Sequence, residues 1–470
     1  MMTKDKNILR LRSLNAAQAA KFILVLLIFA AVSEAPLRAQ QQTSVADDAE
    51  APLLRLDDAI SIALSNNRLV KNSSLEAQKY DFRLSTARSK RLPQFQIAVL
   101  GGELLHSFDF TFDPGAFGTY QNVGPIPGKT TKIHNPARFI TYATGSVDQP
   151  LTQQYKIGLG IKEAELGRQI AGEDVRAERE KIAAEVRAAY YELVATQTGV
   201  EAARQQVTTL EEAQRVTLRY ISEKTVLKSD ALQVDAQLAK AKYELATAEN
   251  GIATQQEHLN QLLGRDLATR FQVEAMPEED NIDLTLAAAR ELAFSNRPEI
   301  RQARLKEKQA EVDRRIAKAE YIPDLSLSVR YQGLDNVRVL PANVATAGFY
   351  LSWEPFDWGR RRNNGAEKAK EVTQARNGTQ ETEAQIAVEV GSKYRKWQET
   401  ALLLKAARVE HEAAGEQFRV TTNKYREQAA LVKDVLQAQA QNTQTEFQYQ
   451  QALSSYWSSL ADLRRAMGEE

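Results

Sequence analysis

The sequence predicts a mainly α-helical chain that also carries membrane β-strands and is built from two copies of one unit. Three observations lead to this fold class. Two blocks of sequence recur in the same order, short segments alternate apolar and polar side chains, and the longest segments keep an apolar seam at spacings of three and four residues. These patterns are typical of an internal repeat, of half-buried strands and of coiled-coil helices, respectively.

The composition excludes several classes of protein. The 61 basic and 61 acidic residues cancel, so nothing indicates a general affinity for nucleic acid. The chain has no cysteine, which excludes disulfides, thiolate metal sites, cysteine nucleophiles and a lipid-modified N-terminal cysteine.

Residues 1–39 have the pattern of a signal peptide, followed by a linker at 40–55. Basic residues precede an apolar run at 22–32, which is too short to span a bilayer as a helix. Cleavage after Ala39 fits, although Leu37 is a mediocre residue at the −3 site, and a buried N-terminal helix is the alternative. No later segment is apolar over the length of a membrane helix, so any entry into a membrane must use β-strands.

The internal repeat is carried by two blocks. Residues 63–68 return at 293–298, and residues 182–190 return at 386–394. Similar helical composition could mimic one block by chance, but hardly both with their order kept.

The repeat sets the domain boundaries, and it also pairs Gly264 with Gly468. We expect a first unit at 56–264, a linker at 265–283 and a second unit at 284–468. The two copies of the first block lie farther apart in the sequence than the two copies of the second block. The first unit is therefore longer than the second, by roughly 25 residues between the blocks.

Each unit is expected to open with a helix. Asp57 and Asp58 lie near the positive end of the first helix, and Thr285 can cap its counterpart. Pro93 and Pro323 end these helices because a proline ring has no N–H for the hydrogen-bond ladder.

After each proline the period changes from helical to alternating. Leu325, Leu327 and Val329 share one face of a segment with the length of a tilted membrane strand. We expect strands at about 324–334 and 344–354 in the second unit.

In the first unit we expect strands at about 94–112 and 138–149. Residues 113–137 lie between them, are rich in glycine and proline, and would form a long loop that takes up the excess length. Two soluble hairpins are the alternative to membrane strands.

Long helices follow the strands. Between Gly167 and Ile221 an apolar seam repeats every seven residues, which is typical of a coiled coil. A helix of about 55 residues extends about 80 Å. One pair of such helices is too thin to bury a core, so we expect it to pack against the second pair and against other subunits.

Four strands cannot close a barrel, for which about eight are the practical minimum. Open strand edges are not tolerated in lipid, so several chains must pool their strands. Two copies would give eight strands and three would give twelve, and the residues alone leave both possibilities open.

The chain resembles the outer-membrane efflux proteins, which are TolC-like channels, from Leu56 to Gly468. The resemblance implies a homotrimer with a twelve-stranded β-barrel in the outer membrane and an α-helical periplasmic barrel. It rests on the helix openings at 63–67 and 293–300, on Pro93 and Pro323, on the turn Trp353-Glu354-Pro355-Phe356-Asp357-Trp358-Gly359, and on residues 434–439.

The resemblance also implies a function, a location and partners. The chain would be a non-enzymatic, passive exit duct in a tripartite efflux or type I secretion system. It would lie in the outer membrane of a Gram-negative bacterium, in contact with outer-membrane lipid, and would reach far into the periplasm. Its partners would be a periplasmic adaptor (membrane fusion) protein and an inner-membrane transporter. The cargo is left open among drugs, metal ions, oligosaccharides and polypeptides.

The family closes its tunnel at the two helix reversals. The resemblance places Asp434 in an acidic ring around the pore, with Gln437 at the position of a second acidic residue. It makes Tyr425 and Asp230 partners in a latch, near which Ala430 replaces an expected arginine. From the residues alone, a helix N-cap or a solvated charge is the better interpretation of both aspartates.

This chain departs from the family pattern in three places. It lacks the lipid-modified cysteine of many relatives, and Thr152 to Lys156 replace a continuation of an aromatic residue, Asp, Gly and Gly. The first helix reversal, 220–230, is one residue longer than the second, 425–434.

No catalytic, cofactor or metal site is expected. The four histidines, His106, His134, His258 and His411, are scattered, and His411 falls on a helix seam opposite Val207 in the repeat. Residues 124–130 resemble a phosphate-binding loop but are one residue short and lack its strand and helix. The alternative function is an exported coiled-coil scaffold or adaptor that forms no pore.

Overall fold

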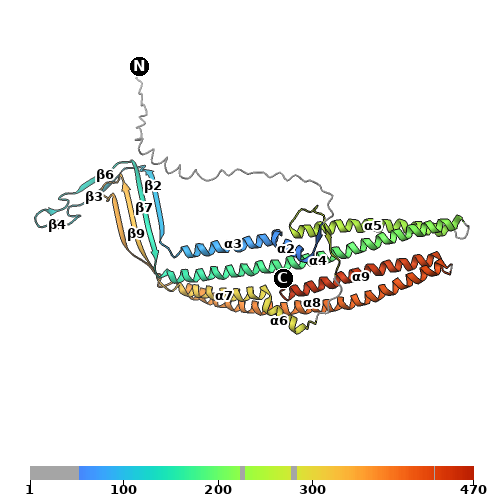
Figure 1. Ribbon diagram of the computed structural model, residues 1–470. Helices are drawn as coiled ribbons and strands as arrows, with labels where there is room; N and C mark the ends of the chain where they lie inside the picture. Colours follow the sequence, from blue (N-terminus) through green and yellow to red (C-terminus); the bar gives the residue numbers. More distant parts are fainter. Residues whose placement is uncertain (1–51, 223–227, 277–282, 428, 470) are drawn as a thin grey trace, which may run out of the picture. The chain divides into compact units, whose positions relative to one another are not determined.

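The structure is a computed structural model that describes residues 52–222, 228–276, 283–427 and 429–469. The expected signal peptide lies outside these residues. In the first unit the main elements are α2 (Leu56–Asn66), α3 (Arg68–Ser89), β2 (Gln94–Glu103), β7 (Phe139–Pro150), α4 (Gln153–Ser222) and α5 (Lys228–Leu263). In the second unit they are α6 (Leu286–Asn296), α7 (Pro298–Ala319), β9 (Asp324–Asp335), β10 (Asn343–Ser352), α8 (Arg360–Arg426) and α9 (Val432–Ala466) (Figure 1).

The opening helix of each unit is broken in two, where the sequence predicts one continuous helix. Asn67 and Arg297 have extended backbones, with ψ values of 132° and 124°. Asn67 caps α3 by accepting a hydrogen bond from the Leu69 N–H at 2.8 Å. Arg297 precedes Pro298, and a residue before proline is disfavoured in helical geometry.

The capping residues expected from the sequence are confirmed. Asp57 and Asp58 lie in the first turn of α2. Thr285 caps α6, because its Oγ1 accepts a hydrogen bond from the Ala288 N–H at 3.3 Å. Negative charge and hydroxyl oxygens at helix N-termini satisfy N–H groups that have no partner within the helix.

The four long strands form one antiparallel sheet in the order β10-β9-β7-β2. Each repeat supplies a hairpin, and the two hairpins join where β7 pairs with β9 from Thr141↔Asp335 to Pro150↔Ser326. β2 and β10 are the edges, and neither has a second partner among the described residues.

The expected strand at 94–112 is divided, which corrects the sequence analysis. β2 ends at Glu103, and β3 (Phe108–Phe112) pairs with β6 (Thr131–Asn135) in a separate sheet. The expected loop at 113–137 contains β6 together with the two-residue strands β4 (Thr119–Tyr120) and β5 (Gly124–Pro125). The pairing is interrupted on both sides: four residues lie between Glu103 and Phe108, and three lie between Asn135 and Phe139 on the paired strand. The two segments therefore differ by one residue, and neither is strand at this point.

The expected linkers also contain structure. β1 (Leu53–Leu54) and β8 (Gln272–Val273) pair in parallel, which joins part of the 40–55 segment to part of the 265–283 segment. Leu54 and the neighbouring Phe271 are buried in the main core. Their apolar side chains explain why these segments pack instead of remaining linkers.

The long helices exceed the predicted length. α4 has 70 residues and begins directly after the sheet, at Gln153 instead of near Gly167. At 1.5 Å per residue it extends about 105 Å. α4 and α8 run the full length of the helical part (Figure 1). α3 packs on the first part of α4 and α5 on its later part. In the same way, α7 packs on the first part of α8 and α9 on its later part. None of the helices in the described ranges has both the length and the apolar character needed to cross a membrane.

Candidate pore wall and gate

The four-stranded sheet has one apolar and one polar face. Side chains of directly paired residues point to the same face, so the registers assign every strand position. The apolar face carries Phe95, Ile97, Val99, Ala143, Val147, Leu327, Val329, Tyr331, Ala345, Ala347 and Phe349. The opposite face is the more polar one: it carries Gln96, Thr144, Ser146, Ser328, Arg330, Gln332 and Thr346, together with Leu100, Ile140, Tyr142, Val344 and Tyr350.

The apolar face has no cover within the described chain. Ile97 is 82% exposed and Phe349 is 74% exposed. No described helix lies across this sheet (Figure 1), and the start of α4 meets β9 where Gln153 Nε2 donates to Ser326 Oγ at 3.2 Å. A contiguous apolar surface across four strands marks contact with lipid or with another protein.

The helices form a wall one helix thick. In the part next to the sheet, α4 lies between α3 and α7, and α7 contacts α8. In the part away from the sheet, α4 lies between α5 and α9, and α9 contacts α8. The two lateral edges of the wall are therefore different: one is made of α3 and α5, and the other of α8.

The edge helix α8 carries an apolar stripe on its free side. Its buried seam falls at intervals of seven residues, including Ile386, Thr400 and Ala407. Leu402 and Val409 lie about 200° around the helix from that seam at 100° per residue, and they are 70% and 65% exposed. A second stripe opposite the packed seam indicates another contact surface.

The other edge also exposes apolar side chains. Phe82 of α3 is 73% exposed, and Leu232 and Tyr243 of α5 are 60% and 72% exposed. Leu232 and Tyr243 share a face of α5, because a separation of eleven residues returns to nearly the same direction. Both edges of the wall therefore lack a partner in the single chain.

A groove of about 950 Å³ crosses α4 between α5 and α9. Its floor includes Ala195, Gly199 and Ala202, and its sides include Tyr243 and Phe447. A Cβ on Gly199 would lie 3.8 Å from the Phe447 ring, so the small residues allow the aromatic ring to approach. Tyr243 and Phe447 are equivalent in the repeat, and sequence analysis did not single them out as a pair that frames a groove.

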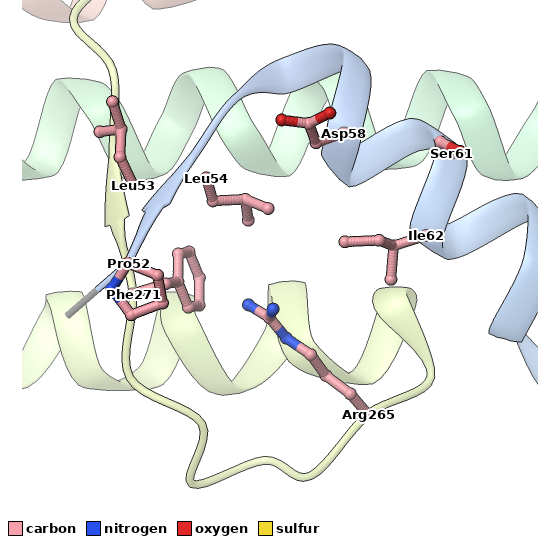
Figure 2. Close-up of a pocket in the computed structure, with 8 residues that line it drawn as sticks. All are labelled: Pro52, Leu53, Leu54, Asp58, Ser61, Ile62, Arg265 and Phe271. Carbon is pink, nitrogen blue, oxygen red and sulfur yellow. The ribbon is translucent and has the colours of Figure 1, made fainter. Parts of the chain in front are cut away.

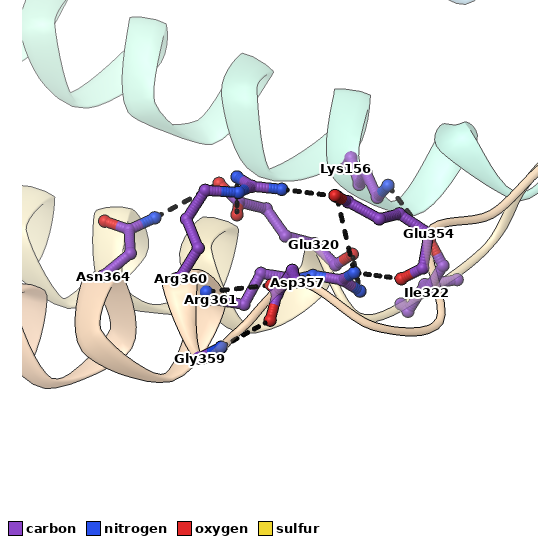
Figure 3. Close-up of polar contacts among 9 residues, drawn as sticks. All are labelled: Lys156, Glu320, Ile322, Glu354, Asp357, Gly359, Arg360, Arg361 and Asn364. Carbon is purple, nitrogen blue, oxygen red and sulfur yellow. Dashed lines mark hydrogen bonds and ion pairs between the residues drawn. The ribbon is translucent and has the colours of Figure 1, made fainter.

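The junction between the sheet and α8 is held by an ionic network (Figure 3). The Arg361 guanidinium is buried, and its Nε donates to Asp357 Oδ2 at 2.6 Å. The backbone N–H groups of Arg361 and Gly359 also donate to Asp357, at 3.0 and 3.1 Å. These bonds, above all that from the Arg361 N–H, lower the pKa of Asp357. The network holds the turn from Trp353 to Gly359 against the start of α8.

Aromatic side chains surround this junction. Trp353, Phe356 and Trp358 are 58%, 68% and 90% exposed, and the Phe356 and Trp358 rings are 4.9 Å apart. Exposed tryptophan and phenylalanine next to a lipid-length sheet are typical of a membrane–water boundary.

The residues that depart from the family pattern join the two repeats. Thr152 donates from Oγ1 to the Pro323 carbonyl at 2.6 Å and accepts from the Leu325 N–H at 2.8 Å. Lys156 Nζ lies 2.6 Å from Asp324 Oδ1. The segment from Thr152 to Lys156 is therefore bonded directly to the second repeat.

Asp434 and Gln437 lie in the first turns of α9. The Asp434 carboxylate accepts a hydrogen bond from the Leu431 N–H at 3.0 Å. Gln437 is exposed one turn later. Leu431, not Asp434, is the N-cap residue of α9; Asp434 is the third residue of the helix and supports the helix start through the Leu431 N–H.

Tyr425 is half-buried in the last turn of α8, whereas the side chain of Asp230 in α5 lies outside the described residues. The expected latch between these two residues therefore stays a prediction.

The α8–α9 seam near the tip is more polar than the equivalent α4–α5 seam. His411 packs between these helices: its Nε2 lies 2.8 Å from Glu446 Oε2, and its ring stacks on Tyr449. The His411 Nδ1 and Asn442 Oδ1 atoms are buried without a hydrogen-bond partner in the described chain. At equivalent positions the first repeat has Val207, Leu210, Leu238 and Ala241, and the second has His411, Ala414, Asn442 and Thr445.

A small pocket of about 390 Å³ lies between α2 and the segment after α5 (Figure 2). The Arg265 guanidinium lies 4.7 Å from the Phe271 ring centre, and Nε donates to Asn260 Oδ1 at 2.6 Å. Burial lowers the pKa of Arg265. These contacts hold the segment after α5 in place. The described residues contain no cluster of His, Cys, Asp or Glu suited to a metal ion.

Comparisons with known proteins agree with this architecture. Residues 289–469 match the family model described as outer membrane efflux protein. No curated relative of similar sequence matches the chain. The chain has the fold of several outer-membrane channels of known structure.

The CmeC channel of Campylobacter jejuni is 16% identical, with a TM-score of 0.70, and the match covers 88% of this chain and 85% of that one. VceC of Vibrio cholerae is 17% identical, with a TM-score of 0.68 and coverages of 88% and 96%. MtrE of Neisseria gonorrhoeae, solved in its open state, is 17% identical, with a TM-score of 0.67 and coverages of 88% and 89%.

The fold class predicted from the sequence, TolC-like with two repeats, is thereby confirmed. Residues 289–469, which make up most of the second repeat, are therefore similar to the outer membrane efflux protein family, and the described chain has the fold of these channels.

Proposed function

We propose that this protein is the outer-membrane channel of a tripartite efflux system, a passive exit duct formed by three copies of the chain. The observation that carries the proposal is the four-stranded sheet with one apolar face, one polar face and two unpaired edges. In lipid the edge strands of such a sheet must pair with other strands, because each unpaired backbone group there costs roughly several kcal/mol.

The strand directions favour closure between copies. Neighbouring strands alternate in direction across the order β10-β9-β7-β2. β10 of one copy would therefore meet β2 of the next in antiparallel orientation. The two edges are different surfaces, so the contact is head-to-tail, which is the kind of contact that generates rings.

Three copies suit a duct better than two. A closed sheet of eight strands has an interior that side chains fill, whereas larger closed sheets enclose a lumen. Three copies would contribute twelve strands, with the polar face of each sheet toward the lumen and the apolar face toward lipid. The helical walls would join at the same edges, with the α8 stripe of one copy against α3 and α5 of the next.

The exposed aromatic residues at the sheet–helix junction support an outer-membrane location. Trp353, Phe356 and Trp358 would lie at the inner lipid boundary, and the long helices would extend from there into the periplasm. As a passive duct, the channel would rely on an inner-membrane transporter to drive transport.

The groove across α4 supports docking of a periplasmic adaptor. Its floor of small residues lies between Tyr243 and Phe447, and a helix can place apolar side chains in such a groove. Gly199→Leu would fill the groove. We expect this variant to keep its oligomeric state and conductance but to lose adaptor binding. Gly172→Leu is the control, because its side chain would extend into open space on the same helix, and it should keep oligomeric state, conductance and adaptor binding.

The tip would hold the gate. Three Asp434 carboxylates around a narrow pore would attract multivalent cations. Gln437, one turn further, would contribute polar but uncharged groups to the constriction, and Tyr425 with Asp230 would latch the closed form. The polar α8–α9 seam supports opening by this pair, because it buries less apolar surface than the α4–α5 seam.

Purification of the mature chain in detergent tests the central proposal. We expect a mass of three chains by light scattering and stable single-channel conductance after insertion into a planar bilayer. A monomer that gives no conductance would contradict the proposal and would favour a coiled-coil scaffold instead.

A further inference from the structure

We propose that Arg330 of β9 sets the charge preference of the strand-lined part of the duct. Three copies of its guanidinium group would form a cationic ring that attracts anionic solutes and repels cationic ones. This inference rests on the proposed function, because it needs the more polar face of the sheet to line a lumen. It concerns which solutes pass, whereas the proposed function concerns the existence of the pore.

Arg330 belongs to a row of polar side chains that crosses all four strands. The pairings Gln96↔Ser146, Ser146↔Arg330 and Arg330↔Thr346 place these four side chains next to one another on the more polar face of the sheet. Arg330 stands near the middle of β9, which has 12 residues. The row is therefore away from both ends of the strand-lined part of the duct.

Arg330 is the only basic residue on this face of the four strands, all of whose residues the structure describes. The acidic residues on the same face are Asp148 and Asp324, and both lie nearer the helices. Asp324 Oδ1 is 2.6 Å from Lys156 Nζ, so its charge is offset. Asp148 pairs with Ser328, two residues along β9 from Arg330. Arg330 is thus the charge on this face that lies farthest from the helices.

Uncharged neighbours hold the guanidinium group against the sheet. Arg330 Nε donates to Ser328 Oγ at 3.2 Å, and the guanidinium carbon lies 5.2 Å from the centre of the Tyr350 ring. A serine hydroxyl and an aromatic ring fix the direction of a guanidinium without neutralising its charge. Arg330 is also exposed.

A fixed cation on a channel wall acts on the ions that pass it. At 0.1 M salt its field reaches about 10 Å before it is screened. Rings of arginine or lysine side chains favour anions in pores. Three copies of Arg330, one from each chain, would therefore favour anions in this part of the lumen.

The absence of cysteine allows the local charge to be measured with one introduced thiol. Thr346 is exposed and pairs directly with Arg330, so Thr346→Cys places a thiol beside the guanidinium group. The channel, reconstituted in lipid vesicles, would be treated with the sulfonatoethyl and the trimethylammonium-ethyl methanethiosulfonates, which carry opposite charges. The ratio of the two modification rates, divided by the ratio for a free thiol in solution, reports the charge at position 346. Arg330→Gln and Arg330→Lys would be combined with Thr346→Cys.

We expect a normalised ratio that favours the anionic reagent in Thr346→Cys. Arg330→Gln should lower it roughly threefold or more at 0.1 M salt, because a charge at the distance of a paired residue is removed, and the difference should shrink at 1 M salt. Arg330→Lys keeps the charge and should keep the preference. A normalised ratio of one in Thr346→Cys, or a ratio unchanged by Arg330→Gln in channels that still conduct, would overturn the inference and leave the pore intact.

Ala347→Cys, on the apolar face of the same strand, separates this outcome from failure of the proposed function. If the more polar face lines a lumen, Thr346→Cys reacts with both reagents, whereas Ala347→Cys reacts with neither because lipid covers it. Equal reactivity at the two positions would contradict the proposed function itself.

Discussion

Gly264, at the end of α5, lies so close to Asn66 that a Cβ atom on it would be 2.5 Å from the Asn66 carbonyl oxygen. Its φ of +67° is also in the left-handed region that favours glycine. The second repeat has the same arrangement, since a Cβ on Gly468 would lie 3.0 Å from the Arg297 nitrogen. In each unit, the end of the last helix therefore packs against the break between the two opening helices.

Gly264→Ala should destabilise the protein by roughly 2–4 kcal/mol, because both the backbone strain and the contact with Asn66 must be accommodated. The free energy of unfolding in urea measures this effect. Gly365→Ala is the matched control, since nothing lies within 4 Å of its added Cβ inside α8. That variant should be unchanged or more stable by up to about 1 kcal/mol, and equal losses in both variants would show that the close contact is unimportant.

Val99→Arg should prevent stable insertion of the sheet. Arginine on a lipid-facing strand position near the membrane midplane costs about 2–4 kcal/mol, and Val99 lies on the apolar face opposite Ala143. Outer-membrane fractionation and heat-modifiable migration on gels measure the result. Ala98→Arg, one residue away on the polar face, should insert normally. Normal insertion of both variants would argue against the assignment of the faces.

Leu402→Glu should weaken assembly between copies without unfolding the chain. Leu402 is 70% exposed on the free side of α8, so a charge there costs little in the single chain but would be buried at the proposed edge contact. Light scattering in detergent should show a shift toward smaller assemblies. Leu402→Met keeps the apolar surface and should assemble normally; an unchanged mass for the glutamate variant would place the contact elsewhere.

Two variants separate the capping role of Asp434 from its proposed pore role. Asn keeps a side-chain oxygen that can accept from the Leu431 N–H, whereas Ala removes it. Asp434→Asn should leave stability nearly unchanged, and Asp434→Ala should cost about 0.5–1.5 kcal/mol, the usual net contribution of one hydrogen bond. Both should weaken block of single-channel current by cobalt hexammine. Unchanged block in both variants would assign Asp434 to helix capping alone.

Asp313→Asn should stabilise the protein at neutral pH by less than about 1 kcal/mol, since the group is partly exposed. Burial raises the pKa of Asp313 in α7 and of Glu163 in α4, whose carboxylates also repel each other. Each folded-state pKa lies above its unfolded value, so the folded state binds more protons than the unfolded state. The free energy of unfolding therefore falls as pH rises from the unfolded-state pKa through the folded-state pKa. Thermal unfolding between pH 4 and pH 7 should show a flatter dependence in the variant. Glu367→Gln, an exposed neighbour on α8, should change neither property.

Much of the architecture could be predicted from the sequence because it is encoded locally. The helix seams and the alternation after Pro93 and Pro323 are properties of short segments. The interruption between Glu103 and Phe108 could not be predicted, because it depends on the pairing with residues 131–139. The groove between Tyr243 and Phe447 likewise depends on which helices flank α4.

The sequence by itself determined that the chain is a doubled unit of strands and long helices that is incomplete alone, because periodicity and repetition are readable without knowing any long-range contact. Only the tertiary structure decided how the edges, faces and helix ends meet. The close fit of Gly264 on Asn66, the bonds of Thr152 to the second repeat and the pairing of β7 with β9 all depend on contacts between residues far apart in the chain. Such pairing is set by packing and register, which no local pattern contains.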